Sequence, residues 1–478
     1  MFKTKLNHDD SIERHKARLV AKGFTQKKGF DYYETYAPVA CMASIRIIAA
    51  IAANNGWKLL QIDIPSAYLN GKIDCDIYIS QPPGYIDENN PLKVWLLLKS
   101  LYGLKQAGKI WNGVLVAFLL ENGFIQSLSD ICIFICIDKN GYIILGVYVD
   151  DLQYAGNESA TIKFLAQVTA TFEMRDLGEA KLILRVQVDQ DKSGIQLHQA
   201  TYIQSIIDEY HLHDAKSVPV PISPTDMGDL NADSSPVDSK LYHSILGKIM
   251  YAMTSTRPDI AFAVSTLAKF SSAPTAYHMA MLMKLLRYLK GTINMCLYYP
   301  NRDGKEILFN GYTDSNHASP LDDYKSRTGY VFLINKTPIT WCSKRQATVA
   351  ISSTEAEYVS ASQSCREAIW LRSLLKDIKH SQEHKATIIY EDNQGAIALS
   401  KNPQNHQRTK HINVHYHYIR EKSESNEICL EYINTSEQAA DIFTKALPKP
   451  VFNKLLDILG MKFCVYGGVL EGKHLPPT

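Results

Sequence analysis

The stretch 148–151 (Tyr-Val-Asp-Asp) constrains the fold of this chain most, because two adjacent carboxylates interrupt two apolar, strand-like runs. Residues 143–149 are apolar and rich in β-branched side chains, and the apolar pattern resumes at 152–155. This pattern predicts a tight β-hairpin with Asp150 and Asp151 at its tip. Adjacent acids repel each other unless a divalent cation neutralises them, so the pair is a candidate metal site. Such pairs also occur at ordinary surface turns.

A third acid strengthens the metal interpretation. Asp63 lies inside the apolar segment 59–64 (LLQIDI), where an unpaired charge is costly. The aromatic Tyr68 follows five residues later. A strand-borne acid, a nearby aromatic residue and a later Asp-Asp hairpin together predict a two-metal nucleotidyl-transfer site.

Composition narrows the class of protein. The formal net charge of +2 provides no overall basic field, so nucleic-acid binding would depend on local patches. The first thirty residues form one basic patch, which is also typical of a solvated face. Nine cysteines without a Cys-x-x-Cys pair argue against a disulfide framework or thiolate zinc site and favour a reducing compartment. No apolar run approaches the roughly 18 residues of a membrane span, and no signal peptide is recognisable, so we expect neither secretion nor membrane insertion.

The first half of the chain has the pattern of an α+β protein. Short apolar strands alternate with predicted helices at 45–54 and 110–122. Residues 218–240 contain four prolines among Ser, Thr and Asp, which predicts an exposed linker. After it, a helix capped by Asp259 and a second helix over 276–290 predict a small helical connector.

The C-terminal part predicts a compact sheet flanked by helices. Its expected elements are strands at 307–309, 329–335, 339–341 and 387–390 and a long helix at 355–378. Asp314 follows a strand, Glu357 lies near the start of the long helix, Asp392 closes a strand and Asp441 opens a helix. Any one of these acids is more often a cap or a surface residue. Four in this order predict convergence on one metal site.

Several ordered segments share a close likeness to one family. They are 16–24, 61–63, 68–71, 100–107, 148–151, 176–181, 256–262, 286–292, 352–358 and 408–412. Through them the chain resembles the reverse transcriptase and RNase H portion of a copia-type (Pseudoviridae) LTR retrotransposon Pol polyprotein, from nearly its first residue to about residue 460.

The resemblance implies an α+β fold, with a right-hand polymerase of fingers, palm and thumb, a helical connector and an RNase H-like α/β domain. The implied boundaries are 1–215 for the polymerase, which begins inside the fingers, 216–240 for a Pro/Ser-rich linker, 241–300 for the connection, 301–460 for the RNase H-like domain and 461–478 for a tail.

The implied function is RNA-directed DNA polymerisation with ribonuclease H activity, copying retrotransposon RNA into DNA. The implied partners are an RNA template, a DNA primer, an RNA–DNA hybrid and dNTPs, with Mg²⁺ or alternatively Mn²⁺ as the cofactor. The expected location is cytoplasmic, in a virus-like particle, or nuclear. The oligomeric state stays open. A competing hypothesis is an impaired, truncated element remnant that at most binds nucleic acid, because Arg185 stands where the family has a glycine.

The resemblance also assigns polymerase residues. It implies that Asp63, Asp150 and Asp151 hold two Mg²⁺ ions and that Tyr68 acts as the steric gate against ribonucleotides. Triphosphate contacts are implied for Lys16 and Arg18, and a place in the nucleotide pocket for Gln106.

For the RNase H half, the resemblance implies that Asp314, Glu357, Asp392 and Asp441 bind two Mg²⁺ ions. Glu355 is the rival of Glu357, and two residues apart on a helix only one of them can be a ligand. We favour Glu357, because the residues behind it resemble the family's helix core.

Four histidines invite a zinc interpretation: His406, His411, His415 and His417. No Cys or acid nearby completes a tetrahedral set, so a stretch without metal is the better interpretation. The resemblance agrees, because it implies substrate-facing roles for the neighbouring Arg408 and Lys410.

Overall fold

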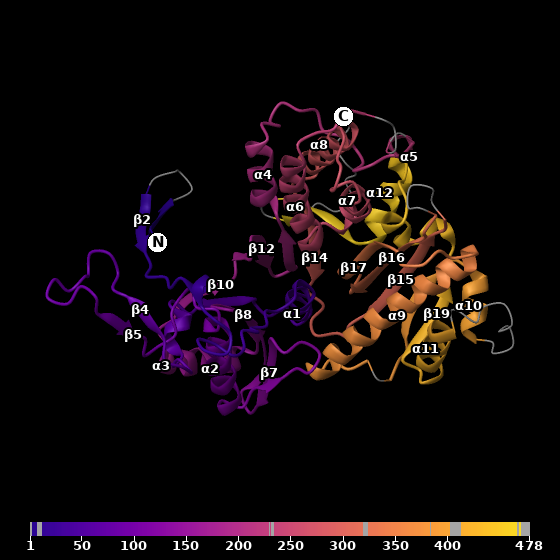
Figure 1. Ribbon diagram of the computed structural model, residues 1–478. Coiled ribbons are helices and arrows are strands. Elements are labelled where there is room, and N and C mark those ends of the chain that lie inside the picture. The colour runs from indigo at the N-terminus through magenta and orange to yellow at the C-terminus, as the bar shows by residue number, and fades with distance from the viewer. Residues whose placement is uncertain are drawn as a thin grey trace. The chain divides into compact units, whose positions relative to one another are not determined.

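The computed structural model describes residues 2–6, 12–228, 230, 234–318, 324–382, 384–401, 413–465 and 468–469 (Figure 1). Its contacts divide the chain into two compact units, with Met1–Cys41 and Leu60–Glu179 in unit 1 and Met42–Leu59 and Ala180–Thr478 in unit 2. Residues 180–215, which the sequence assigned to the polymerase part, thus group with unit 2. Every helix within the described ranges falls short of the length and apolarity needed to cross a bilayer.

A six-stranded antiparallel sheet forms the centre of unit 1. Its order is β10-β3-β9-β8-β7-β6, with β3 Leu60–Asp63, β6 Ile125–Gln126, β7 Ile133–Asp138, β8 Gly141–Tyr148, β9 Asp151–Gly156 and β10 Arg175–Glu179. The predicted hairpin is confirmed, because β8 and β9 pair up to Tyr148 and Asp151 and leave only two residues in the turn. The middle of β8 is buried throughout, which explains its unbroken apolar run.

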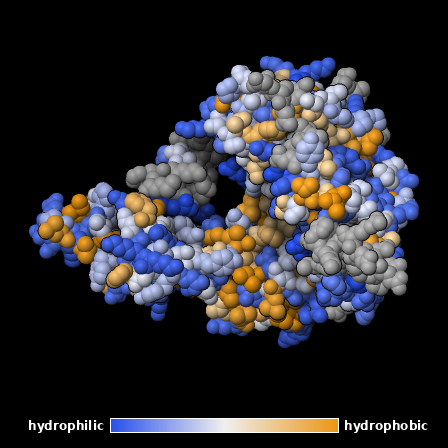
Figure 2. All heavy atoms as spheres, turned by 45° about the vertical axis from the view of Figure 1, so that its right-hand side comes forward, coloured by the Kyte–Doolittle hydropathy of each residue, from blue (hydrophilic) through white to orange (hydrophobic). Residues whose placement is uncertain are grey.

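Two helices pack on this sheet: α2 (Ala107–Glu121), which confirms the helix predicted at 110–122, and α3 (Glu158–Thr171). Trp111, Leu115 and Phe118 of α2 follow helical spacing and enter the core. Smaller elements are β1 Phe2–Leu6, β2 Ile12–Ala17, η1 Gly23–Thr25, η2 Ala67–Asn70, β4 Tyr78–Ser80 and β5 Val94–Leu96. Apolar side chains also reach the surface, as the orange atoms in Figure 2 show. Leu92, which precedes β5, and Val94 in β5 are exposed.

Unit 2 contains the sheet on which the C-terminal acids lie. Its order is β17-β16-β15-β18-β19, with β15 Phe309–Asn316, β16 Arg327–Ile334, β17 Thr337–Arg345, β18 Thr387–Glu391 and β19 Ile428–Tyr432. The first three strands are antiparallel, whereas β18 pairs in parallel with β15 and β19. The long helix α9 (Ser353–Asp377) packs on β15 and β16 (Figure 1). This is the RNase H-like α/β arrangement that the resemblance implied.

The remaining elements of unit 2 are a second sheet and several helices. The sheet runs β11 Leu182–Ile183, β12 Val186–Asp191, β13 Gly194–His198, β14 Met295–Pro300, β20 Met461–Val465 and β21 Gly468–Val469. The helices are α1 Met42–Asn54, α4 Ala200–Glu209, α5 Pro224–Met227, α6 Ser239–Ser255, η3 Pro258–Ile260, α7 Ala261–Ala268, α8 Ala276–Gly291, α10 Gln394–Lys401, α11 Asn413–Glu424, η7 Thr435–Glu437, η8 Ala439–Phe443 and α12 Lys449–Ile458.

Asp259 does not cap a helix, so that prediction is wrong. It lies inside η3, and both of its carboxylate oxygens accept hydrogen bonds from Arg257, at 2.9 and 2.7 Å. The hydroxyl of Tyr288 in α8 donates to the same carboxylate at 2.7 Å. All three side chains are buried, so the acid serves as the counter-charge of a buried arginine.

The segment 216–240 is not an exposed linker either. Val220 and Ile222 are 6% and 4% exposed, and Leu230 is 1% exposed. Asp226 forms an ion pair with Lys284 of α8 at 2.6 Å. Pro224 begins the short helix α5 within this segment, and the few apolar residues between the prolines pack into unit 2.

Arg185 occupies the turn between β11 and β12. Only Leu184 and Arg185 separate the paired residues Ile183 and Val186, and their φ values are +48° and +63°. Two positive φ angles in a two-residue hairpin are typical of a type I′ turn, which favours glycine. The family's glycine at this position is therefore explained by backbone conformation.

Relieving this turn gives a first testable prediction. The Arg185→Gly variant is expected to be more stable than the Arg185→Ala variant, with a free energy of unfolding higher by about 1 kcal/mol. The reason is that alanine keeps the Cβ that the left-handed region disfavours. Both variants lose the guanidinium that lies 5.8 Å above the Tyr202 ring, so the comparison isolates the backbone. Urea unfolding followed by circular dichroism measures the difference. Equal stabilities would show that the turn is unstrained.

Candidate active sites

The three acids that the resemblance assigned to a polymerase site lie together in unit 1. Asp63, the last residue of β3, pairs in register with Asp151, the first residue of β9. The backbone N–H of Ile64 donates to the carbonyl of Asp150 at 2.9 Å. Directly opposed residues of antiparallel strands have Cβ atoms about 4.5–5.5 Å apart, so the register alone brings these carboxylates to one place.

The hairpin tip has an unusual backbone. Val149, a β-branched residue, has a φ of +59°, a conformation that costs on the order of 1–3 kcal/mol outside glycine. The indole N–H of Trp111 donates to its carbonyl at 2.7 Å. The strained turn is thus held by a buried side chain of α2.

Asp151 has a perturbed carboxyl group. Burial raises its pKa to about 6, while a hydrogen bond from Gln61 acts in the opposite direction. That bond runs from Gln61 Nε2 to Asp151 Oδ1 at 2.7 Å. The neighbouring charges of Asp150 and Asp63 raise the pKa further. A cation at this position would relieve the repulsion among the three acids.

Two tyrosines and an arginine line up beside these acids. The rings of Tyr68 and Tyr102 lie 4.6 Å apart between centroids, and the guanidinium of Arg18 lies 5.2 Å from the Tyr102 centroid. Burial and then the charge of Asp150 raise the pKa of both tyrosines. The structure therefore brings Arg18 and Tyr68 into one group near Asp150. The sequence analysis gave Tyr102 no role, although it lies in the segment 100–107, which shares the likeness to the family.

Gln106 is not available to a nucleotide, contrary to the prediction. Its side chain is 0% exposed. Its Nε2 donates to the carbonyl of Asp31 at 2.8 Å, and its Oε1 accepts from Gln26 Nε2 at 3.0 Å. It therefore ties the loop around residues 26–31 to the start of α2. The side chain of Lys16 lies outside the described residues, so its predicted triphosphate contact stays a prediction.

Three of the four C-terminal acids form a compact group in unit 2. One carboxylate oxygen each from Asp314, Glu357 and Asp392 lies within 4.8 Å of the other two. Asp314 comes from β15, Glu357 from the first turns of α9, and Asp392 directly follows β18. Among the described residues this is the acid group that meets this criterion. The predicted convergence of these three residues is confirmed in placement.

Burial perturbs the carboxyl groups of this site. It raises the pKa of Asp314 to about 7, against the opposing charge of Lys445. Burial also raises the pKa of Glu357, and the charge of Glu391 adds to this effect. Without a cation the group therefore tends to retain protons near neutrality.

Asp441 is placed differently from the prediction. It does not open an α-helix but lies inside the 3₁₀ helix η8. Its Oδ1 lies 2.8 Å from Lys445 Nζ, which is also 3.8 Å from Asp314 Oδ2. The hydroxyl of Thr444 donates to Asp314 Oδ2. Asp441 thus borders the acid group through a shared lysine, outside the three-oxygen cluster.

Glu391 lies beside the acid group, and the sequence analysis missed it. It is the last residue of β18, is 0% exposed, and burial raises its pKa well above the ordinary value. The sequence analysis predicted the adjacent Asp392 as the metal ligand at the end of this strand. The signal in the sequence was a second acid at the end of an apolar strand.

Glu355 and Glu357 have separate tasks. Glu355 Oε2 accepts from the backbone N–H of Ile351 at 2.9 Å, and its own N–H donates to Ser352 Oγ at 3.2 Å. This is a helix-capping arrangement. Ser352 is therefore the N-cap of α9 and Glu355 supports this cap by holding the preceding residue, whereas Glu357 joins the acid group, in agreement with the preference for Glu357.

The donor set fits a hard divalent cation. Carboxylate oxygens are the ligands that Mg²⁺ and Mn²⁺ prefer. Within the described structure, Glu357 Oε2 and Glu391 Oε2 are buried and have no hydrogen-bond partner. Buried carboxylate oxygens without a hydrogen-bond partner are costly, and a metal ion would satisfy them. Of the four histidines that invited a zinc interpretation, His406, His411 and the side chain of His415 lie outside the described residues, and His417 is exposed.

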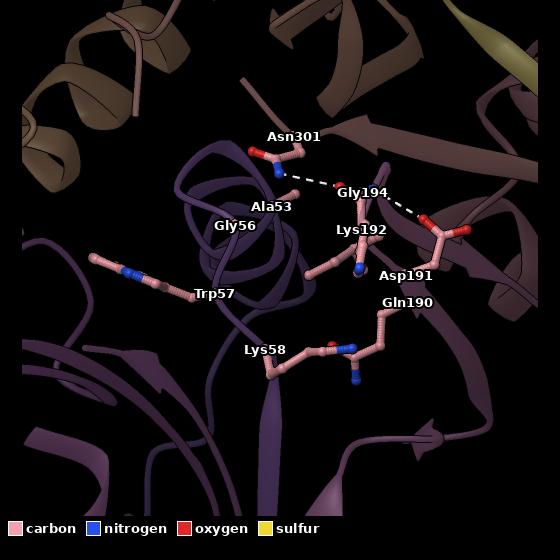
Figure 3. A pocket seen from close by; sticks show the side chains of 10 residues that line it. Ala53, Gly56, Trp57, Lys58, Gln190, Asp191, Lys192, Gly194 and Asn301 are labelled. Carbon is pink, nitrogen blue, oxygen red and sulfur yellow. Dashed lines mark hydrogen bonds between the residues drawn. The ribbon is translucent and has the colours of Figure 1, made fainter. Parts of the chain in front are cut away.

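A separate cavity of about 270 Å³ lies in unit 2 (Figure 3). Trp57 and Lys58 line it from one side. Lys192, in the turn between β12 and β13, and Asn301, which follows β14, line it from the other, and Asn301 Nδ2 donates to the Lys192 carbonyl at 3.1 Å. The seven predicted carboxylates are not among its lining residues. The candidate chemistry therefore lies elsewhere.

A family model and several sequence relatives place the chain in the same protein family. The family model for "Reverse transcriptase (RNA-dependent DNA polymerase)" matches residues 1–224. The chain is 37% identical to the retrovirus-related Pol polyproteins of transposon RE1 of Arabidopsis thaliana and transposon TNT 1-94 of Nicotiana tabacum, over 96% of its own length in both cases. It covers 31% and 35% of these relatives, so it spans about a third of their length.

A shorter relative and solved structures complete the comparison. A transposon Ty5-1 protein of Saccharomyces cerevisiae is 34% identical over 64% of this chain and 100% of its own length. A foamy viral protease–reverse transcriptase in complex with double-stranded DNA matches with a TM-score of 0.47 at 12% identity, over 90% of this chain and 64% of that one. From its sequence relatives, the chain belongs to the family of copia-type retrotransposon Pol proteins.

Proposed function

We propose that this chain is an RNA-directed DNA polymerase that also cleaves the RNA strand of RNA–DNA hybrids. The observation that carries the polymerase proposal is the register of β3 against β9, which pairs Asp63 with Asp151 beside Asp150. The match of residues 1–224 to the reverse transcriptase family supports it. The nuclease proposal depends on the cluster of Asp314, Glu357 and Asp392 on an RNase H-like sheet.

In the proposed polymerase reaction, Asp63, Asp150 and Asp151 would hold two divalent ions against the primer terminus and the incoming triphosphate. Bound there, such ions lower the pKa of the primer 3′-hydroxyl and neutralise charge on the departing pyrophosphate. The protein contributes positioning, because Asp63 and Asp151 lie on paired strands and Asp150 lies in the turn beside them. Arg18 offers a planar fork suited to phosphate oxygens, near Tyr102 and Tyr68.

Tyr68 would select deoxynucleotides. Its half-buried ring packs on Tyr102 near Asp150, where a nucleotide sugar would lie above the metal-binding acids. A ring in this place excludes a ribose 2′-hydroxyl by volume.

Replacing the gate tests this role. Tyr68→Val is expected to raise incorporation of rNTPs relative to dNTPs by at least about tenfold, equal to about 1.4 kcal/mol of discrimination. Tyr68→Phe keeps the ring and is the matched control, so its ratio should stay within about twofold of the parent. Single-nucleotide extension with each triphosphate measures the ratio. An unchanged ratio in Tyr68→Val would remove Tyr68 from sugar selection.

In the proposed nuclease reaction, Asp314, Glu357 and Asp392 would hold the metal that activates water against the RNA phosphate. Asp441 would complete the site beside Lys445. The proposal extends to the polymerase boundary at 215, the RNase H-like boundaries at 301–460 and a cytoplasmic or nuclear site of action. Each follows from the family resemblance.

Assays on the full chain test the proposed function. A DNA primer on an RNA template with dNTPs and Mg²⁺ should be extended, and a labelled RNA–DNA hybrid should be cut. The strained β11–β12 turn at Arg185 favours the second candidate, an impaired remnant. Hybrid binding without extension or cleavage would establish that candidate.

A further inference from the structure

Two uncharged side chains hold the hairpin tip that carries Asp150 and Asp151. We propose that Trp111 and Gln61 are positioning residues of the polymerase site, which orient these carboxylates for metal binding without touching the substrate. This inference rests on the proposed polymerase function.

Trp111 fixes the backbone of the tip. Val149 has a left-handed conformation that a β-branched residue adopts only where its surroundings enforce it. The Trp111 indole N–H holds the Val149 carbonyl at 2.7 Å, and Ile64 N–H holds the next carbonyl, that of Asp150, at 2.9 Å. Trp111 is 1% exposed and packs edge-on against Phe172 at 5.5 Å, so its ring has a defined orientation.

Gln61 fixes the carboxylate of Asp151. The register of β3 and β9 pairs Gln61 with Gln153 and Asp63 with Asp151, so Gln61 lies diagonal to Asp151 on the same face. Its amide donates to Oδ1 at 2.7 Å, which sets the direction of Oδ2. Gln61 is 6% exposed, which limits its alternative rotamers.

The chemistry of the two donors matters as much as their geometry. An indole and an amide are neutral, so they orient acidic groups without supplying a charge that would compete with a metal ion. The nuclease site differs, since Lys445 places an ammonium 2.8 Å from Asp441. Neutral donors keep the full negative charge of the polymerase acids for the metal.

The variants Trp111→Phe and Gln61→Leu remove one donor each and keep most of the packed volume. Each should lower kcat for primer extension by about tenfold while the dNTP KM stays within about twofold, because misplaced acids slow chemistry more than nucleotide binding. The Mg²⁺ concentration for half-maximal rate should rise by about fivefold or more. Trp341→Phe is the matched control, because it removes the indole bond to the Met253 carbonyl at 3.1 Å in unit 2.

Mn²⁺ binding without substrate provides a readout that does not depend on activity. Electron paramagnetic resonance of the full chain, in a background with Asp314→Asn and Asp392→Asn, should show several-fold weaker Mn²⁺ binding in both variants and no change in Trp341→Phe. Unchanged Mn²⁺ affinity together with a lowered melting temperature would overturn the proposal and leave a packing role. An inactive parent whose Mn²⁺ affinity still depends on both donors would contradict the proposed function but support the positioning role.

Discussion

Asp150→Asn is expected to abolish primer extension, with a rate at least about 100-fold below the parent, equal to about 2.7 kcal/mol of transition-state stabilisation. Asparagine keeps the shape of the side chain, and the backbone of residue 150 stays bonded to Ile64. The loss is therefore one of charge at the metal site. Extension of a DNA primer on an RNA template, with Mg²⁺ and with Mn²⁺, measures it.

Asp76→Asn is the matched control for this prediction. Asp76 is an exposed carboxylate of the same unit, so the substitution changes the charge of unit 1 equally. Its extension rate should equal that of the parent. If Asp150→Asn extends primers within about threefold of the parent, the metal-binding role of the hairpin is wrong.

Asp392→Asn is expected to remove cleavage of the RNA strand by a similar factor of at least about 100 and to leave hybrid binding nearly unchanged. The two effects differ because the acids would act on the reacting phosphate through the metal, whereas affinity for nucleic acid comes from basic side chains. Cleavage of a 5′-labelled RNA in a hybrid, and binding of the same hybrid by fluorescence anisotropy, measure the two quantities.

Asp457→Asn provides the comparison within unit 2, because Asp457 is an exposed acid of α12. It should leave both cleavage and binding intact. A parallel loss of binding in Asp392→Asn would indicate that the residue supports the fold, and retained cleavage would remove it from the metal site. Combined with Asp150→Asn, the experiment also asks whether each activity survives the loss of the other.

Local patterns were sufficient for much of the fold. The apolar runs around 148–151 predicted the β8–β9 hairpin, and helical spacing predicted α2, α8 and α9 within a few residues. These patterns succeed because the period of apolar residues reports directly which face of a strand or helix is buried. The order of the acids along the chain, together with the family resemblance, predicted two acid groups that the structure brings together: Asp63 and Asp151 with Asp150, and Asp314, Glu357 and Asp392.

The sequence-based predictions that the structure contradicts have one physical cause in common. Asp259 resembles a helix cap in sequence, but it neutralises a buried arginine. Gln106 was predicted to line the nucleotide pocket, but its amide forms hydrogen bonds with the Asp31 carbonyl and the Gln26 side chain. Val220 and Ile222 stand among prolines, yet they are buried. In each case the burial depends on segments that are distant in sequence, such as Tyr288 for Asp259, although the arginine itself, Arg257, is only two residues away.

The sequence by itself determined which residue types could perform the chemistry and on which elements they lie, because local periodicity and family motifs carry that information. Only the tertiary structure decided which acids meet, since strand register pairs Asp63 with Asp151 and buries Glu391 beside Glu357. It also decided which neutral and charged donors orient them, such as Trp111 and Lys445. The physical reason is that burial and hydrogen bonding depend on distances between segments, which folding sets and a linear pattern does not contain.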